Sequence, residues 1–409
     1  MKTQCIRNIG GLLFAGLLAG PTQAMVQEIT AKFRPDPTNV NMNRFVNTTP
    51  VTGYCQTYPS QCTGGMFSLR LPIKAESAGP LEASPSDPRK AALWRAPANW
   101  RQTTVTNLQG EQETVEIRIS GIGSQYVFDR PVSELVGGGA VLASHWKLWG
   151  WTWVYPPGVC GYSGVGFYGA AWYGFFWRTP VEGDCVKTQA YQIPYMRYEY
   201  LDIAYELRTP NPLSMSAGQY FGSFSYSLGP HKDFDLGDMM LPDDSVLTLN
   251  FTLDVDHILK VELPPGGNRV ILQPQGGWQA WLNQGRRPTR LFRDQTFSIY
   301  SSGRFKMNLE CGLAIGNTCG LSNSNGDQVP LQVGVSLPFG LNDQYGQGVN
   351  KRPLRLDGSG TELVQATHYV SNRPGTLHFE VGKDDVEQML KTPGSTYSGL
   401  VTVVWDSEV

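Results

Sequence analysis

The sequence predicts an all-β protein that consists of two Ig-like antiparallel β-sandwiches in tandem. Short runs of alternating apolar and polar residues are frequent, and turn sequences separate them. A helical period is nearly absent. The 46 glycines and 28 prolines are spread over the 409 residues without a repeat, which excludes collagen and a coiled coil.

The alternating runs give the expected strands in order. Turn sequences such as Pro265-Gly266-Gly267 and Asn325-Gly326 lie between them. One segment, Lys383–Leu390, has the spacing of a helix of about two turns. The predicted strands are Thr114–Ser120, Phe224–Leu228, Val246–Val255, Leu259–Leu263, Thr296–Tyr300, Val329–Leu337, Thr376–Val381 and Leu400–Trp405.

Residues 1–24 have the pattern of a secretory signal peptide. Lys2 and Arg7 give a basic start, Ile9–Ala19 forms an apolar run, and small residues precede Ala24. The apolar run is too short to span a bilayer. The sequence therefore predicts export and a mature chain that begins at Met25.

Export to an oxidising compartment favours disulfide bonds between the cysteines that remain after Cys5 is removed. Several connectivities are possible, and local pairs are the simplest. No C-x-x-C motif occurs and no histidine lies at ligand spacing from a cysteine, so we expect neither a metal nor another cofactor. The local pairs are Cys55–Cys62, Cys160–Cys185 and Cys311–Cys319.

The charge balance argues against nucleic acid as a partner. The chain has 33 Lys and Arg residues against 35 Asp and Glu residues, a net charge of −2, and no basic run. Nucleic-acid-binding proteins concentrate positive charge on one surface or helix. The sequence offers no such concentration.

Two segments of similar pattern suggest that the second sandwich lacks a strand. Ala217–Tyr226 and Pro393–Val403 each contain a glycine turn, a Tyr-x-Gly motif and an alternating strand. Another strand, Val246–Val255, follows the first segment, whereas the sequence ends soon after the second. Chance similarity of so short a pattern is the alternative interpretation.

We place the domain boundary between Asp256 and Ile258. The N-terminal domain then comprises residues 25–256 and the C-terminal domain residues 257–409. The first domain has all of its strands under this interpretation, and the second ends one strand early.

The last strand, Leu400–Trp405, is expected to have an unpaired edge. Both of its faces are largely apolar, with Val401, Val403 and Trp405 on one of them. An apolar strand with an open edge is an aggregation hazard, which secreted bacterial subunits avoid by borrowing a strand from another chain. Leu400, Val401, Val403 and Trp405 are therefore the candidate contacts for a chaperone or a donor strand.

From Ala217 onward, the sequence resembles the chaperone–usher fimbrial tip adhesins and minor pilins of the colonization-factor class (class 5, alpha-type). The N-terminal half matches them only in position and size. The segments that carry the resemblance are AGQYFGSFSYSLGPHKDFDLGD, LTLNFTLDVDH, FSIYSSGRFKMNLEC, NSNGDQVPLQVGVSLPFG and TYSGLVTVVWDSEV.

The resemblance implies an N-terminal receptor-binding domain joined to a C-terminal pilin domain without its last strand. The implied partners are a periplasmic pilus chaperone, an outer-membrane usher, the N-terminal strand of the adjacent subunit and a host-cell receptor, with a glycan as one candidate. The implied location is the tip of a fimbria on the cell surface. Met25–Arg34, soon followed by Pro35 and Pro37, gives no long alternating donor arm, which fits a tip position.

An uncharged aromatic segment is the candidate receptor site. Residues 148–177 carry no charge, and six of the eleven tryptophans lie between Trp146 and Trp177. The alternation of Trp149, Trp151 and Trp153 predicts one face of a strand. The aromatic side chains suit a sugar or another amphipathic ligand, but they suit an aromatic core equally well. The candidate receptor-binding residues are Trp151, Trp153, Trp172, Trp177 and Arg178, with Arg178 positioned to pair with an acidic receptor group.

An enzyme is the weaker alternative. The acid pairs Asp233/Asp235 and Asp254/Asp256 would suit a glycosidase, yet the aromatic segment contains no carboxylate at all. We therefore predict no enzymatic activity and no catalytic residues. A fimbrial assembly initiator without adhesive activity is the remaining alternative.

Overall fold

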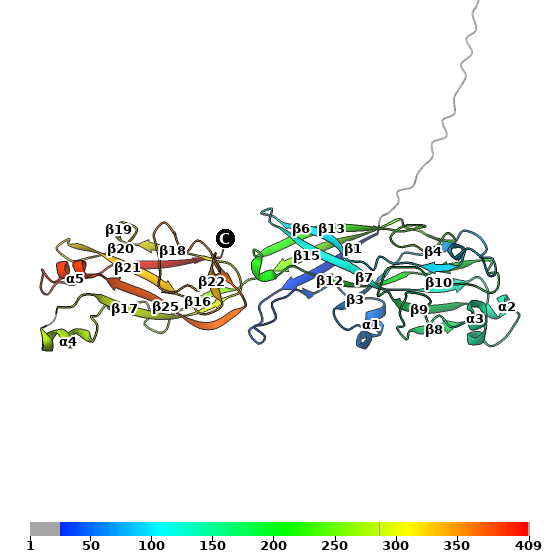
Figure 1. Ribbon diagram of the computed structural model, residues 1–409, viewed down its shortest axis with the longest axis horizontal. Coiled ribbons are helices and arrows are strands. Elements are labelled where there is room, and N and C mark those ends of the chain that lie inside the picture. The colour runs from blue at the N-terminus through cyan, green and yellow to red at the C-terminus, as the bar shows by residue number, and fades with distance from the viewer. Residues whose placement is uncertain (1–24, 286, 408–409) are drawn as a thin grey trace, which may run out of the picture.

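The computed structural model describes residues 25–285 and 287–407. The predicted signal peptide lies outside the described residues. Strands hold 44% of the residues and helices 10%, which confirms the all-β class. Figure 1 shows two elongated bodies arranged end to end. We call residues 25–256 the N-lobe and residues 257–407 the C-lobe.

Each lobe has its own hydrophobic core. Buried side chains between Ile29 and Val255 form one cluster, and buried side chains between Leu291 and Val386 form another. The predicted boundary between Asp256 and Ile258 falls in the gap between the two clusters. That boundary remains a proposal about independently folding units.

One large sheet dominates the N-lobe, and the long strand β7 (Gln112–Phe128) is its centre. Strand β7 also has partners outside the main strand order of this sheet. It pairs with β9 (Trp172–Arg178), which pairs with β8 (Gly166–Gly169). It also pairs with β12 (Leu201–Arg208), which pairs with β3 (Met66–Leu71). The main path runs through β14 (Met240–Pro242), β4 (Ala75–Ser77), β11 (Met196–Tyr198), β7, β6 (Arg101–Asn107), β13 (Gly218–Ser227), β15 (Val246–Val255), β1 (Met25–Phe33) and β2 (Val46–Asn47).

Two glycines allow β9 to pack closely on β7. A Cβ atom at Gly121 would lie 2.5 Å from the ring of Phe176, and one at Gly123 would lie 2.5 Å from the carbonyl oxygen of Phe175. Real side chains do not tolerate such distances, so β7 has glycine at these two positions, where β9 pairs with it. A short separate ladder joins β5 (Ala92–Trp94) to β10 (Cys185–Lys187).

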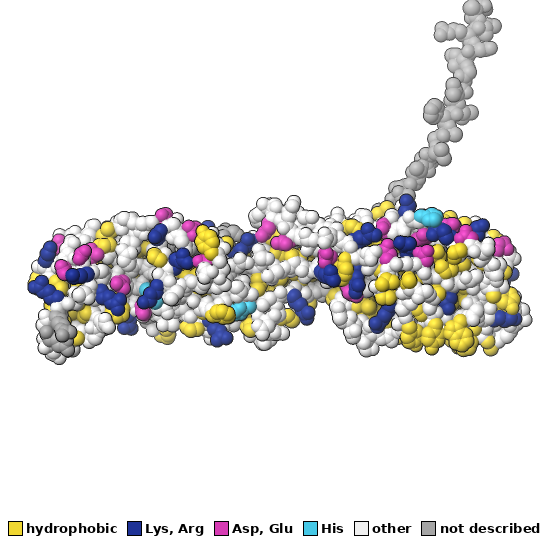
Figure 2. Space-filling view, in the orientation of Figure 1, with side chains coloured by type: hydrophobic (Ala, Val, Ile, Leu, Met, Phe, Trp, Pro, Cys, Tyr) yellow, Lys and Arg dark blue, Asp and Glu magenta, His cyan; other side chains and the backbone are white. Residues whose placement is uncertain are grey.

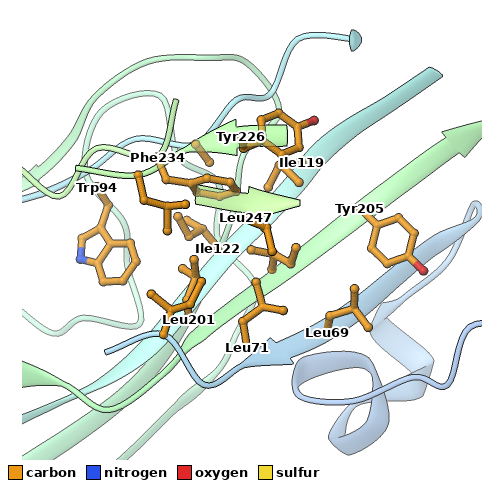
Figure 3. Packing of buried hydrophobic residues seen from close by; sticks show 14 of the residues in the cluster. Leu69, Leu71, Trp94, Ile119, Ile122, Leu201, Tyr205, Tyr226, Phe234 and Leu247 are labelled. Carbon is orange, nitrogen blue, oxygen red and sulfur yellow. The ribbon is translucent and has the colours of Figure 1, made fainter. Parts of the chain in front are cut away.

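The N-lobe core lies between β3, β7, β12 and β15. Figure 3 shows Leu69, Leu71, Ile122, Leu201 and Leu247 directed toward one another from these four strands. The indole of Trp94, at the edge of this cluster, donates a 3.0 Å hydrogen bond to the buried hydroxyl of Tyr198. The polar atom is thereby satisfied inside the core.

The C-lobe contains a second sheet and a separate two-stranded ladder. In the sheet, β23 (Arg352–Pro353) pairs with β21 (Gln328–Ser336). In a separate pair, β22 (Leu341–Asp343) lies beside β24 (Val364–Ala366). The ladder joins β18 (Lys306–Cys311) to β26 (Val401–Asp406). The main sheet runs β16 (Leu259–Glu262), β17 (Leu291–Ser301), β25 (Val370–Val381), β21 (Gln328–Ser336), β20 (Thr318–Ser322) and β19 (Ala314–Ile315).

All eight predicted strands and the predicted helix are confirmed. Each strand segment overlaps a strand of the structure, and α5 spans Lys383–Met389. One pair departs from the antiparallel pattern that the sequence predicts, because β1 pairs with β15 in parallel over its whole length. The helices that the sequence did not predict are α1 (Tyr54–Thr57), α2 (Val132–Leu135), α3 (Val141–Trp149) and α4 (Gly277–Gln284).

The interpretation of Met25–Arg34 as a segment without long alternation also needs correction. Residues Met25–Phe33 alternate clearly, and buried positions such as Ile29 and Phe33 face the core. The prolines that follow the segment end the strand without preventing it. The segment is thus an integral strand of the N-lobe, bonded to β15 and β2.

The three local disulfide pairs are confirmed. Cys55 is bonded to Cys62, Cys160 to Cys185, and Cys311 to Cys319. The first two pairs lie in the N-lobe and the third lies in the C-lobe. No disulfide among the described residues connects the lobes, so each lobe keeps its own covalent links.

We predict that residues 25–256 fold without the C-lobe, because their core and strand pairing are contained within the fragment. The purified fragment should be soluble and unfold in one cooperative thermal transition. If the fragment is insoluble while the full chain, produced together with a chaperone, is soluble, the boundary is misplaced.

Candidate functional site

The strand β26 is paired on one edge only. Its residues match β18 in antiparallel register, from Val401 opposite Cys311 to Asp406 opposite Lys306. Within residues 25–285 and 287–407, no second strand pairs with it. The backbone groups on its other edge therefore face away from any ladder in the described chain.

The N-lobe contains a similar arrangement with the missing neighbour present. Strand β13 pairs with β6 on one edge and with β15 on the other, where the ladder runs from Gly218 to Ser227. Strands β13 and β26 carry the two segments of similar pattern found in the sequence. Within the described residues, β26 thus has one paired edge where β13 has two.

The side chains of β26 are apolar yet incompletely covered. Val401, Val403 and Trp405 are half-buried and pack against the C-lobe core. The Trp405 ring meets the Phe297 ring at a centroid distance of 5.1 Å, in an edge-to-face arrangement. Leu400, just before the strand, is 69% exposed. The apolar side chains of β26 are therefore only partly covered by the described residues.

Polar contacts join the two lobes. Arg304 of the C-lobe donates to Glu111 at 2.8 Å and to the Ser216 hydroxyl at 2.6 Å. The His257 imidazole bridges the lobes, because its Nε2–H donates to the Met215 carbonyl at 2.9 Å. A cavity of about 210 Å³ lies beside these groups and is also lined by residues at the start of β16 and by Ser407.

The aromatic segment folds differently from the sequence prediction. Trp149 is the last residue of helix α3, and Gly150 follows it in the left-handed conformation with φ of 69°. Trp151 and Trp153 lie in the turns after the helix, so the three tryptophans do not share a strand face. A left-handed C-cap glycine ends the helix and redirects the chain, which is why alternation in the sequence misled here.

Two of the predicted receptor-binding residues belong to the core. Trp153 is 1% exposed and Trp177 is 0% exposed. Their rings stack at 5.2 Å, and the Trp177 indole donates to the Trp153 carbonyl at 2.7 Å. Neither side chain reaches solvent, so neither contacts a ligand in this conformation. Their burial supports the core interpretation for this part of the segment.

Trp151 is exposed, and the structure adds aromatic residues that the sequence did not single out. Trp151 is 53% exposed and stacks with Trp146 of α3 at 5.5 Å. Tyr155 and Tyr162 stack with each other at 5.1 Å and are 49% and 55% exposed. Both pairs lie outside regular strands, and no period in the sequence distinguishes them from the buried rings.

The hairpin β8–β9 brings two further exposed rings to the same end of the N-lobe. Phe167 and Tyr168 of β8 are 38% and 45% exposed. In Figure 2, hydrophobic side chains gather at the lower right of the molecule, over the elements that Figure 1 labels α3 and β8. We define the aromatic patch as Trp146, Trp151, Tyr155, Tyr162, Phe167 and Tyr168.

Trp172 and Arg178 lie at the two ends of β9. Trp172 is half-buried and contacts the Phe167 ring edge-to-face at 6.0 Å. The Arg178 guanidinium is half-buried and donates to the Gln61 carbonyl at 3.0 Å, beside the Cys55–Cys62 disulfide. A receptor-binding role for Trp151, Trp172 and Arg178 stays a prediction.

A buried histidine connects the elements that carry the aromatic patch. His145 of α3 is 1% exposed, and its Nε2–H donates to the Gly169 carbonyl of β8 at 2.9 Å. Because the carbonyl only accepts, Nδ1 must accept from the Tyr126 hydroxyl, which lies 2.8 Å away. The Trp149 indole donates to the same hydroxyl at 3.1 Å. The network is complete only with a neutral imidazole.

The acid pairs have structural partners rather than a catalytic arrangement. Asp235 is buried, and the Arg89 guanidinium donates to both of its carboxylate oxygens. Asp254 pairs with Lys32 at 2.8 Å, and Asp233 accepts hydrogen bonds from the backbone and side chain of Ser227. Among the described residues, no cluster of His, Cys, Asp and Glu could hold a metal ion, and no helix is long and apolar enough to cross a membrane.

No protein-family model matches the chain, and neither does any curated protein sequence. CfaE, the adhesive subunit of CFA/I fimbria of enterotoxigenic Escherichia coli, is similar with 11% identity, 93% of this chain and 92% of that chain covered, and a TM-score of 0.23. The chaperone–tip adhesion subunit pre-assembly complex CsuC–CsuE from the archaic chaperone-usher Csu pili of Acinetobacter baumannii is similar with 10% identity, coverage of 94% and 98%, and a TM-score of 0.23. Scores this low do not place the chain in the family of either protein.

The buried and exposed tryptophans give a matched pair of substitutions. Trp153→Ala should lower the free energy of unfolding by about 3–5 kcal/mol, because it removes a fully buried indole and leaves a cavity. Trp151→Ala should change it by less than about 0.5 kcal/mol, because the ring is exposed. Denaturant unfolding of the N-lobe transition measures both, and equal losses would contradict the assignment of Trp153 to the core.

The stability of the N-lobe should fall in mild acid. Burial holds the pKa of His145 below its ordinary value of 6.5, so the unfolded chain takes up a proton at a higher pH than the folded chain does. The contribution of the neutral imidazole to the free energy of unfolding is therefore complete above pH 6.5, and it decreases as the pH falls below 6.5. Lys187, whose pKa burial lowers to about 8, is already charged in this range.

Unfolding free energies measured between pH 7.5 and pH 5 test this point. The difference between the wild type and His145→Gln should shrink as the pH falls, because only the wild type has an imidazole that takes up a proton in the unfolded chain while it stays neutral in the folded chain. His231→Gln is the matched control, because the His231 side chain is 71% exposed. A constant difference across the range for His145→Gln would show that the imidazole does not titrate as argued.

Proposed function

We propose that this protein is the tip subunit of a chaperone–usher fimbria. In this proposal the N-lobe binds a receptor and the C-lobe is completed by a strand from another chain. The observation that carries the proposal is the one-sided pairing of β26, set against the two-sided pairing of β13. A partly covered apolar strand with an open edge is the geometry that strand addition requires.

The proposed partners follow from this edge. A periplasmic pilus chaperone binds β26 first, and the N-terminal strand of the adjacent subunit replaces it during assembly at an outer-membrane usher. Leu400, Val401, Val403 and Trp405 are the proposed contacts, because they are apolar and lie on or beside the open strand. The protein then passes through the periplasm to the cell surface, as the predicted signal peptide also requires.

The position of β1 supports the tip rather than the shaft. A shaft subunit must offer its own N-terminal strand to a neighbour. Here Met25–Phe33 is bonded to β15 over nine residue pairs and buries Ile29, Ala31 and Phe33 in the N-lobe core. Removing this strand would expose those side chains and the edge of β15. The protein therefore accepts a strand and caps or initiates the fimbria.

The binding role of the N-lobe is supported by the aromatic patch. Exposed aromatic clusters on soluble proteins usually mark interaction sites. Asp235 is bound by the Arg89 side chain and Asp254 by the Lys32 side chain, which favours a binding protein over an enzyme. A fimbrial initiator without adhesive activity is the alternative, and adherence of the purified full chain to host cells separates the two: an adhesin binds and a pure initiator does not.

We predict that a supplied strand stabilises the C-lobe of the full chain. Fusing a neighbouring subunit's N-terminal strand after Val409 through a flexible turn should raise the melting temperature of the C-lobe by about 10 °C or more. The gain is expected because several apolar side chains become covered, each contributing about 1.5–3 kcal/mol. The same effect should follow from adding the cognate periplasmic chaperone.

The matched control carries the same fused strand with its alternating apolar residues changed to serine. It keeps the backbone and the length but cannot fill the apolar positions. Equal, cooperative and monomeric melting of the unfused chain, the fusion and the control would mean that the C-lobe is already complete, which would remove the main support for the fimbrial proposal.

A further inference from the structure

The aromatic patch has flat apolar faces that are already arranged in pairs. The Trp146 and Trp151 rings lie 28° from parallel, and the Tyr155 and Tyr162 rings lie 14° from parallel. Stacking within each pair holds both rings in place without a ligand, so little side-chain entropy is lost on binding. Each pair therefore presents a preformed aromatic surface to solvent.

The edges of these rings carry unused hydrogen-bonding groups. Trp146 and Trp151 offer indole N–H donors, and Tyr155, Tyr162 and Tyr168 offer hydroxyls. None of these groups has a partner within the described residues. A ligand that contacts the patch thus meets apolar faces and polar edges side by side.

No charged group belongs to the patch. Residues 148–177 contain no Asp, Glu, Lys or Arg. Lys147, next to Trp146, donates to the Val136 carbonyl at 2.7 Å and lies over the Tyr191 ring. Arg178, at the other end of the segment, is bound to the Gln61 carbonyl. Both flanking cations are held by other parts of the N-lobe.

These three properties select the ligand class. A pyranose ring has an apolar C–H face and a rim of hydroxyl groups, which matches aromatic faces with polar edges. An acidic sugar would bury its carboxylate or sulfate without a cation to pair with it, which is costly. A purely apolar surface would leave the indole and phenol groups of the patch without partners.

We propose that the aromatic patch is the binding site for an uncharged glycan, whose pyranose rings stack on the two ring pairs. This inference rests on the proposed adhesin function and specifies the ligand of that site. It also moves the site from the buried Trp153 and Trp177 to side chains that solvent reaches.

The test uses the full chain on a glycan array in which neutral glycans are matched with sialylated and sulfated versions of the same cores. We expect binding to neutral members, unchanged by moderate salt. Affinity for the best neutral glycan is then measured for variants. Trp151→Leu should weaken binding by about tenfold, the factor that a loss of ~1.4 kcal/mol produces, whereas Trp151→Phe should retain most of it.

Leucine is informative because it keeps an apolar side chain but removes the flat ring. If the patch bound apolar material, Trp151→Leu would bind octyl-coated beads as well as the wild type does, and the neutral-glycan proposal would be overturned. Tyr162→Phe keeps the ring and removes only the hydroxyl, so a smaller loss is expected. Phe339→Ala, at a side chain of the C-lobe that is 92% exposed, is the control for loss of an exposed aromatic ring.

Two further outcomes are distinguishable. The first is selective binding of acidic glycans that is weakened by salt and abolished by Arg178→Ala. This result would overturn the proposal and favour Arg178 as the residue that pairs with an acidic receptor group, while the adhesin function would stand. Absence of binding to every glycan and to host cells would instead contradict the adhesin function itself. Melting temperatures of all variants confirm that each is folded.

Discussion

A backbone constraint governs this molecule, because an apolar strand with an unpaired edge leaves a row of backbone donors and acceptors that another chain can pair with. In the N-lobe, β13 lies between β6 and β15, and β1 covers the far edge of β15. In the C-lobe, β26 has β18 alone among the described residues. In our proposal, the same constraint makes the N-lobe self-contained and the C-lobe dependent on a partner chain.

Local patterns made the strands predictable, because a period of two is a property of neighbouring residues. The run Val246–Val255 is the clearest case, and the structure gives the same bounds. The pairing of strands was not predictable in the same way. Met25–Phe33 alternates as clearly, yet its parallel partner lies more than two hundred residues later. Its place in the N-lobe is decided by the exposed edge of β15, which no local pattern shows.

The candidate site was less predictable, for reasons that the tryptophans illustrate. Trp149, Trp151 and Trp153 alternate, but the left-handed Gly150 ends a helix between the first two. Trp153 is then buried while Trp151 is exposed. Residue type cannot separate these cases, because an indole suits a core and a binding surface equally. The exposed pairs combine Trp146 of α3 with Trp151 in the turn after the helix, and Tyr155 with Tyr162 outside regular strands, so no single period in the sequence identifies them.

An exposed aromatic surface and an open strand edge are both aggregation hazards, and they are managed differently. On the aromatic patch, Trp146 stacks on Trp151 and Tyr155 on Tyr162, so part of each ring is covered by its neighbour. The remaining edges are polar and interact with water. At β26 no such solution exists, because backbone donors and acceptors can be satisfied only by another strand or by solvent. In our proposal, the patch stays available for a ligand, whereas a chaperone and then a donor strand cover the edge of β26.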